Sequence, residues 1–253
     1  PGAKALDGVD LDVRAGEVHC LLGQNGAGKS TLIKVLAGAH QPDAGEITWR
    51  GRTVSLLHPQ AAMALGIATI YQELDLVPGL TVADNVFLGR EHSRLGLMRP
   101  ATANRATAEL MARLGHHEIR PTTEVGTLPA AGQQMVSIAR ALSQDARLII
   151  MDEPSAVLDN EEVDRLFHVI RDLRADGVAV LYISHRLEEI REIGDRTTIL
   201  KDGRTVATGI SARDTPTREV ITLMTGRDIE YVFPERREPP GADVQPLLEV
   251  DGL

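Results

Sequence analysis

Hydrophobic residues along the chain follow two different periods, which alternate from one segment to the next. Continuous apolar runs occur in "EVHCLLG", "IATIYQ", "RLIIMDEP" and "VAVLYISH", and such runs are typical of strands that are buried on both faces of a sheet. Between these runs, apolar residues recur at helical spacing, for example at Val163, Leu166, Phe167, Ile170 and Leu173. Buried strands that alternate with helices predict an α/β fold with a largely parallel sheet.

Shorter patterns predict the remaining elements of this fold. The alternation of Val9, Leu11 and Val13 predicts a half-exposed antiparallel strand ahead of the first buried one. "PDAGEITWRG" predicts a turn followed by a short strand, and "TTILKDGRTVATG" predicts a hairpin that turns at Asp202 and Gly203. The segments "KSTLIKVLAG", "HPQAAMALG" and "REVITLMTG" show helical spacing.

Composition along the chain predicts one main domain over residues 1–225. We expect a core of residues 1–72 and 145–225 with a helical subdomain, residues 73–144, inserted into it, because "TVADNVFLG", "NRATAELMARLG" and "GQQMVSIARAL" are helical in pattern. Residues 226–253 are rich in proline and charge, which predicts a linker. The closing letters "PLLEVDGL" predict the first strand of a second, truncated domain.

The overall composition argues against several classes of protein. With 253 residues, 43% of them hydrophobic, the chain has enough apolar material for a substantial core. The net charge of −9 and the lack of a Lys/Arg block argue against a protein that binds nucleic-acid phosphates. The single cysteine, Cys20, lies in an apolar run, and we expect it to be a small buried hydrophobe in a reducing compartment. No apolar stretch reaches the ~18–20 residues that cross a bilayer and no signal peptide opens the chain, so we expect membrane association only through a partner.

A glycine-rich segment after the first buried strand carries the clearest chemistry. "GQNGAGKS" fits the pattern G-x-x-x-x-G-K-[ST], and its position between a strand and a helix argues against a chance glycine turn. Glycines let backbone N–H groups converge on phosphate oxygens, and the following helix N-terminus adds partial positive charge. Lys29 would bind the β- and γ-phosphates, and the Ser30 hydroxyl would bind Mg²⁺. The predicted ATP-binding residues are Gly23, Gln24, Asn25, Gly26, Ala27, Gly28, Lys29, Ser30 and Thr31.

An acidic pair ends the buried strand "RLIIMDEP". Asp152 can hold Mg²⁺ through water, and Glu153 is placed to orient or deprotonate the water that attacks the phosphate. Taken alone, an Asp-Glu pair at a strand end is usually a solvated turn. Together with the glycine-rich loop, the pair predicts an ATPase that uses Mg²⁺.

With these two motifs, the chain resembles the nucleotide-binding domain of ABC transporters over almost all of residues 1–225. "IYQELDLVP" resembles the family's Q-loop, which implies that Gln72 contacts Mg²⁺ and the attacking water. "PSAVLDN" resembles the D-loop, which implies that Leu158 and Asp159 lie across a dimer interface. "LYISHR" resembles the switch region, which implies that His185 contacts the γ-phosphate, although a lone histidine after a strand is more often structural.

Three longer segments are similar to the first half of the double-length ATPase subunit of bacterial sugar importers of the ribose, galactose and xylose type. They are "KALDGVDLDVRAGEVHCLLGQNGAGKSTLIKVLAG", "YQELDLVPGLTVADNVFLGRE" and "GQQMVSIARAL". The resemblance implies a P-loop NTPase (RecA-like) core with a mostly parallel sheet and an antiparallel β portion. It also implies a second nucleotide-binding domain in the same parent chain, transmembrane permease subunits, an extracytoplasmic sugar-binding protein as an indirect partner, and a peripheral position on the cytoplasmic face of the membrane.

Three other functions stay open at this point. The same kind of importer could carry nucleosides or an autoinducer, because the motor domain never touches the cargo. A soluble ABC ATPase of DNA repair or ribosome rescue would usually carry a long coiled-coil insertion or a basic linker, and this chain has neither. A nucleotide-sensing module without hydrolysis is the third alternative.

One motif departs from the family's pattern. The family's signature, typically L-S-G-G-Q, corresponds here to Leu128, Pro129, Ala130, Ala131, Gly132 and Gln133. Pro129 has neither a hydroxyl nor an N–H, and Ala131 adds a methyl group, so two lost phosphate donors could remove about 3–6 kcal/mol of interaction. Pro129 could equally serve to begin the following helix. We expect the site with Glu153 to hydrolyse ATP, and the opposite composite site, which this segment closes, to be weak. The family's adenine-stacking aromatic would lie before Pro1, outside this chain.

Overall fold

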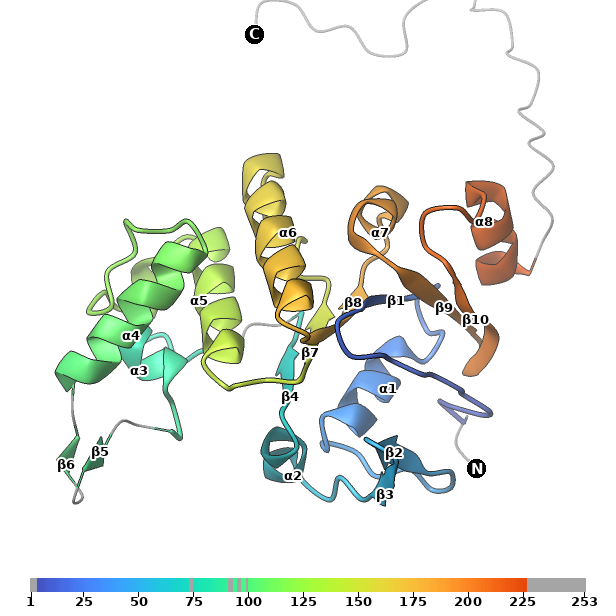
Figure 1. Cartoon of the computed structure of the whole chain (residues 1–253), viewed down its shortest axis with the longest axis horizontal. Helices are drawn as coiled ribbons and strands as arrows, with labels where there is room; N and C mark the ends of the chain where they lie inside the picture. Colours follow the sequence, from blue (N-terminus) through green and yellow to red (C-terminus); the bar gives the residue numbers. More distant parts are fainter. Residues whose placement is uncertain (1–3, 73–74, 91–92, 95–96, 99, 227–253) are drawn as a thin grey trace, which may run out of the picture.

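The central sheet of the computed structural model is mixed, with β10 as an antiparallel edge strand on otherwise parallel strands (Figure 1). The structure describes residues 4–72, 75–90, 93–94, 97–98 and 100–226. The strand order is β10-β9-β1-β8-β7-β4. The strands are β1 (Val18–Gly23), β4 (Ile67–Ile70), β7 (Leu148–Asp152), β8 (Ala179–Ile183), β9 (Arg196–Lys201) and β10 (Arg204–Ser211).

Side chains of the inner strands alternate between two hydrophobic cores, one on each face of the sheet. Along β8, Val180 and Tyr182 belong to the first core, and Leu181 and Ile183 belong to the second. All four are fully buried. The continuous apolar runs of the sequence therefore arise from strands with no solvent-exposed face.

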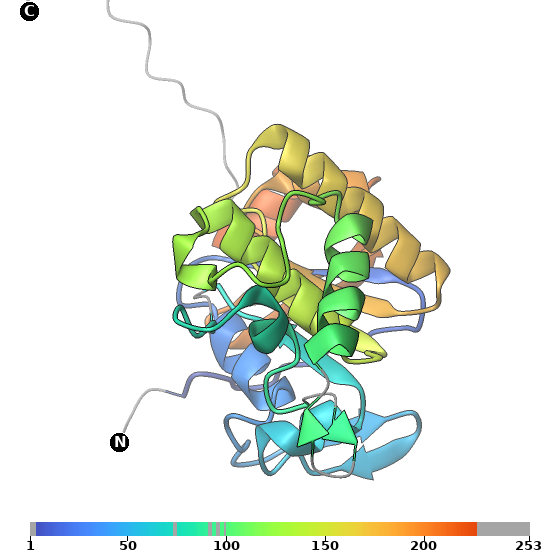
Figure 2. The same ribbon diagram turned by 90° about the vertical axis from the view of Figure 1, so that its left-hand side faces the viewer.

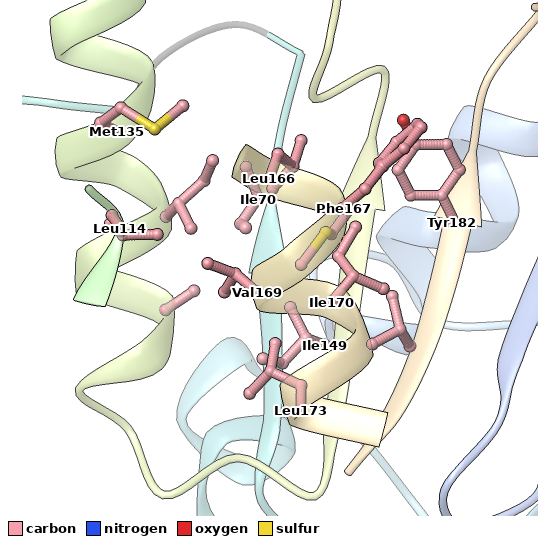
Figure 3. Packing of buried hydrophobic residues seen from close by; sticks show 14 of the residues in the cluster. Ile70, Leu114, Met135, Ile149, Leu166, Phe167, Val169, Ile170, Leu173 and Tyr182 are labelled. Atoms are coloured by element: carbon pink, nitrogen blue, oxygen red, sulfur yellow. The ribbon is translucent and has the colours of Figure 1, made fainter. Parts of the chain in front are cut away.

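Helices cover both faces of this sheet. The first core lies under α6 (Asn160–Ala175), α7 (Leu187–Ile193) and α8 (Thr217–Thr225), and Figure 3 shows Ile170 and Leu173 of α6 beside Ile149 of β7. The second core is completed by α1 (Lys29–Leu36), α2 (Pro59–Ala64) and the hairpin of β2 (Ile47–Trp49) and β3 (Arg52–Val54).

A separate group of helices extends from the β4 side of the sheet (Figures 1 and 2). Its members are α3 (Val82–Val86), α4 (Pro100–Arg113), a 3-10 helix (Val125–Thr127) and α5 (Ala130–Leu142). A short hairpin of β5 (Ser93–Arg94) and β6 (Leu97–Met98) precedes α4, where the sequence pattern predicts helical structure alone. Met111 of α4, Val86 of α3 and Met135 of α5 are buried in the first core, so this group packs on the sheet domain through shared apolar contacts.

Local sequence signals explain where several elements begin and turn. The α6 helix begins with a capping box in which Asp159 accepts from the backbone N–H of Glu162 at 2.9 Å, while the Glu162 side chain accepts from the Asp159 N–H at 2.9 Å. Between β9 and β10, Asp202 and Gly203 have φ values of 49° and 75°, as a two-residue hairpin turn requires. The predicted hairpin is therefore confirmed.

The predicted α/β fold with a largely parallel sheet is confirmed, and one predicted element is wrong. Val9, Leu11 and Val13 alternate with exposed residues and pack against the second core, as expected, but they form no strand. Their alternating burial comes from packing on the second core, since this stretch lacks the ladder of backbone hydrogen bonds that defines a strand. Cys20 is buried and free, and burial raises the pKa of its thiol.

The division of the chain at residues 72 and 145 stays a prediction. The predicted linker and second-domain start at 227–253 lie outside the described residues. Among the helices that the structure describes, none is both long and apolar enough to cross a membrane.

Candidate nucleotide-binding site

Four segments predicted to carry chemistry follow four neighbouring parallel strands. In register, Ile70 of β4 pairs with Met151 of β7, Asp152 of β7 pairs with Ile183 of β8, and Ile183 pairs with Leu21 of β1. The carboxyl ends of these strands therefore meet at one edge of the sheet. This edge is where α/β folds bind ligands.

The loop after β1 has a backbone that requires glycine at several positions. Gly26 and Gly28 have φ values of 82° and 103°, in the left-handed region that favours glycine. A Cβ atom on Gly23 would lie 2.5 Å from the carbonyl oxygen of Leu200, and one on Gly28 would lie 2.8 Å from that of Ala5. The glycines are thus needed for the shape of the loop as well as for ligand approach.

Lys29 is held over its own loop. Its Nζ donates to the carbonyl oxygens of Gly23 at 2.7 Å and Gln24 at 3.1 Å. Burial lowers the pKa of Lys29, and the nearby carboxylates of Glu153 and Asp152 oppose that shift. The lysine therefore stands between a carbonyl-lined loop and two acids from another strand.

The other predicted loop residues differ in how much side chain they expose. Gln24, Asn25 and Ser30 are exposed, and Thr31 is partly buried. Ala27 is 4% exposed and belongs to the second core, and its carbonyl accepts from the N–H of Gly203 at 3.1 Å. Ala27 thus anchors the loop to the β9–β10 turn.

The acidic pair at the end of β7 contains one buried and one partly accessible carboxyl group. Burial raises the pKa of Asp152, the neighbouring Glu153 raises it further, and Lys29 opposes both effects. Glu153 has a left-handed backbone with φ of 50°, and its N–H donates to the carbonyl oxygen of Ile183 at 3.0 Å. Its Oε2 lies 2.7 Å from Nδ1 of His185. The structure therefore brings together Glu153 and His185, which belong to two motifs far apart in the sequence.

Gln72 lies two residues beyond β4 and is exposed. The parallel pairing of β4 with β7 brings it to the edge that carries Asp152. Residues 73 and 74 of the same predicted loop lie outside the described residues.

Residues 128–133 lie at the beginning of α5, in the separate helical group, and not in one of the four loops. Pro129 is the N-cap residue of α5, which agrees with its predicted role in beginning a helix. Gln133 donates to the carbonyl oxygen of Pro129 through its N–H at 3.0 Å and to that of Leu128 through Nε2 at 2.9 Å. Leu128 and Ala131 are partly buried, Gly132 is buried, and Ala130 is exposed.

The predicted interface residues after β7 have local partners within this chain. Leu158 is 8% exposed and belongs to the first core. Asp159 caps α6. Core packing and helix capping within this chain account for the positions of both residues, and their role at a dimer interface stays a prediction.

A polar cluster around Glu189, beside these loops, was not predicted from the sequence. Glu189 of α7 is 6% exposed and accepts from Ser155, Tyr182 and Ser184. In the sequence, Glu188 and Glu189 look like two exposed acids in the first turn of a helix, which is where acidic residues are common. Glu189 precedes the apolar Ile193 by four residues, and this helical spacing could have indicated that both side chains face inward.

Comparison with known proteins identifies the family. The ABC transporter family model matches residues 6–156. The Ribose import ATP-binding protein RbsA 1 of Streptomyces avermitilis is 52% identical over all of this chain, and RbsA 1 of Rubrobacter xylanophilus is 51% identical. The chain spans 47% and 50% of the length of these two relatives.

A solved structure agrees with this assignment. It is an ATP-binding cassette in a dimeric, post-hydrolysis state bound to ADP and Pi, and it is 26% identical with a TM-score of 0.73. The match covers 83% of this chain and 92% of that one. The glycine loop and acidic strand end described above thus lie on a known P-loop NTPase fold, and the chain belongs to the ABC transporter family as one ATP-binding cassette.

Proposed function

We propose that this chain binds MgATP at the carboxyl edge of its sheet and hydrolyses it to drive a sugar importer. The observation that carries the proposal is the convergence of Lys29, Asp152, Glu153 and His185 from three neighbouring strands. The loop of residues 23–31 would hold the triphosphate through backbone N–H groups, and Lys29 would exchange its two carbonyl partners for phosphate oxygens.

The residues at this edge fit a magnesium ion. Asp152, Ser30 and Gln72 supply the oxygen ligands that Mg²⁺ prefers, and the acids Asp152 and Glu153 face one partly buried lysine. Burial raises the pKa of Asp152 and the neighbouring Glu153 raises it further, so a bound cation would favour the charged form of this carboxyl. When bound, the ion would supply positive charge against the negative charge that develops on the phosphate.

Hydrolysis would use Glu153 and His185 as a pair. Glu153 would accept a proton from the water whose oxygen attacks the γ-phosphorus, and the bond to the bridging oxygen of ADP would break. His185 would contact the γ-phosphate while its Nδ1, at 2.7 Å from Oε2 of Glu153, keeps that carboxylate in place. Gln72 would orient the same water from the β4 side.

The altered signature supports two composite sites that differ in activity. In a dimer with a second domain of the parent chain, residues 128–133 would close over the nucleotide of that other domain, and Leu158 and Asp159 would lie at the interface. Pro129 offers no N–H and no hydroxyl there. We expect the site containing Glu153 to be the hydrolytic one and the opposite site to bind nucleotide weakly.

The names of the relatives support sugar as the cargo and permease subunits as partners. On this proposal the cassette is the first of two in the parent chain and works at the cytoplasmic face of the membrane. Its helical group, α3 to α5, would receive a cytoplasmic helix of the permease, and closure of the dimer would move that helix. A thermal-shift screen of the partner binding protein against sugars, nucleosides and autoinducers would identify the cargo.

The experiment that tests the proposal is ATP hydrolysis by the full-length two-domain subunit carrying Glu153→Gln. Loss of the general base should lower hydrolysis by about 100-fold or more while ATP binding persists. Lys29→Ala should instead weaken nucleotide binding. Retention of most activity in the Glu153→Gln subunit would refute the assignment of hydrolysis to this site.

A further inference from the structure

A buried carboxylate on α7 gathers hydrogen bonds from several directions. Oε2 of Glu189 accepts from Ser155 Oγ at 2.9 Å, from Tyr182 Oη at 2.9 Å and from Ser184 Oγ at 2.7 Å. A guanidinium nitrogen of Arg186 donates to Oε1 at 3.3 Å. Both carboxyl oxygens of Glu189 therefore face donors, which is the arrangement that the charge of a buried carboxylate requires. Burial of such a charge is costly unless donors surround it.

Two of the donors belong to the loops that carry the catalytic pair. Ser155 follows Glu153 by two residues, and Ser184 directly precedes His185. Glu189 therefore joins the loop after β7 to the loop after β8 through one oxygen atom. The Glu153–His185 contact of 2.7 Å spans the same two loops.

The third donor is attached to the sheet and not to either loop. Tyr182 lies inside β8, and its ring packs edge-to-face against Phe167 with centroids 6.3 Å apart (Figure 3). Burial raises the pKa of Tyr182, and the Glu189 carboxylate raises it further, so its hydroxyl stays a donor. Tyr182 thus ties Glu189 to a central strand of the sheet, while the two serines tie the loops of the catalytic pair to Glu189.

We infer that Glu189 is a positioning residue whose carboxylate holds the loop bearing Glu153 and the loop bearing His185 at the separation at which those two side chains pair. Its importance for hydrolysis rests on the proposed function. Its effect on the Glu153–His185 contact does not, because both side chains of that contact belong to this chain.

The kinetic test compares Glu189→Gln with Glu188→Gln in the full-length subunit. Glu188 is the exposed neighbour in the same helical turn, so it is a matched control for loss of an acid from α7. Displacement of a catalytic group by about 1 Å costs up to about 100-fold, so we expect Glu189→Gln to lower kcat by about 10- to 100-fold. The dissociation constant of an ATP analogue should stay within about twofold, because the side-chain hydrogen bonds of Glu189 within the described chain go to Ser155, Tyr182, Ser184 and Arg186 and not to the loop after β1.

The second test reads the contact itself in the nucleotide-free subunit labelled with ¹⁵N-histidine. The His185 imidazole resonances, assigned by their loss in His185→Gln, report whether Nδ1 is bonded to a carboxylate. Glu153→Gln gives the spectrum of the broken contact. We expect Glu189→Gln to move these resonances toward that spectrum and Glu188→Gln to leave them unchanged.

Single-donor variants separate positioning from stability if Glu189→Gln folds poorly. Ser155→Ala and Ser184→Ala remove the ties to the loops, so each should lower kcat and shift the His185 resonances. Tyr182→Phe removes the tie to the sheet and should lower the melting temperature alone. Unchanged His185 resonances in both serine variants, or equal kinetic losses in all three, would overturn the inference. A wild-type subunit without ATPase activity would refute the proposed function, and the imidazole spectra would still decide this inference.

Discussion

The helix that carries the altered signature begins without a side-chain cap, and Pro129→Ser should supply one. Pro129 has φ of −62° and ψ of 162°, and no side chain caps the helix there. Thr81 has nearly the same backbone, with φ of −69° and ψ of 163°, and its hydroxyl accepts from the N–H of Asp84 at 3.2 Å. A serine in place of Pro129 would reach the equivalent N–H, that of Gly132, without a change in the backbone.

The size of the effect follows from two opposing terms. A new N-cap bond stabilises a protein by about 1 kcal/mol. Loss of proline frees the unfolded chain and costs about 0.4–1 kcal/mol. The net gain of Pro129→Ser over the native chain is therefore near zero, but Pro129→Ala loses the same rigidity without gaining a cap. The free energy of unfolding should be about 1 kcal/mol higher for Pro129→Ser than for Pro129→Ala.

Thermal unfolding followed by circular dichroism checks this difference. At this chain length, 1 kcal/mol corresponds to about 2–4 °C in the melting temperature. Equal melting temperatures for the two variants would refute the idea that residue 129 is an N-cap position with a free donor above it. In the full-length subunit, Pro129→Ser also returns a hydroxyl and an N–H to the signature. The weaker of two nucleotide sites should then bind about 10-fold tighter or more, since each donor to a charged group contributes about 1.5–3 kcal/mol.

Two further predictions concern the loop after β1 and the acidic strand end. Gly23→Ala should destabilise the chain more than Gly26→Ala, because a Cβ atom on Gly23 would lie 2.5 Å from the carbonyl oxygen of Leu200, whereas one on Gly26 would have no atom within 4 Å. Urea unfolding should show a free energy of unfolding lower by a further ~1–3 kcal/mol for Gly23→Ala, and equal losses in the two variants would contradict the steric argument. Asp152→Asn should abolish hydrolysis yet raise the melting temperature at neutral pH, because the raised pKa means that the charged form of Asp152 destabilises the fold. That advantage should shrink as pH falls through the pKa of folded Asp152 toward the unfolded value of 3.8, and a constant difference from pH 8 to about pH 4 would contradict it.

Much of this fold could be predicted from local pattern, because each inner strand and its following helix have a distinct period. The run "RLIIMDEP" becomes β7 since both faces of that strand are buried, and the spacing of Leu166, Phe167 and Ile170 becomes the inner face of α6. The glycine loop was found because its pattern also sets its conformation, as the positive φ angles of Gly26 and Gly28 show.

Features that depend on contacts distant in sequence could not be predicted in this way. Val9 to Val13 alternates like a strand, but whether a strand forms is decided by a pairing partner, which the pattern does not contain. Glu189 is a charged residue type, and its burial is possible because donors from two other segments, Ser155 after β7 and Tyr182 and Ser184 at the end of β8, surround it. A single sequence without those donors placed in space gives no reason to put a carboxylate in the interior.

The backbone of Glu153 shows why the site depends on such distant contacts. A non-glycine residue at φ of 50° costs about 1–2 kcal/mol, so surrounding interactions must hold it there. The Glu153 N–H donates to Ile183 at 3.0 Å, its carbonyl accepts from Ala156 at 3.2 Å, and Ser155 between them is tied to Glu189. These bonds fix the turn from both sides, and the Glu153 side chain then meets His185 without further adjustment. The strained turn and the buried carboxylate are therefore two parts of one arrangement, because Ser155 lies in the turn and its hydroxyl donates to Glu189.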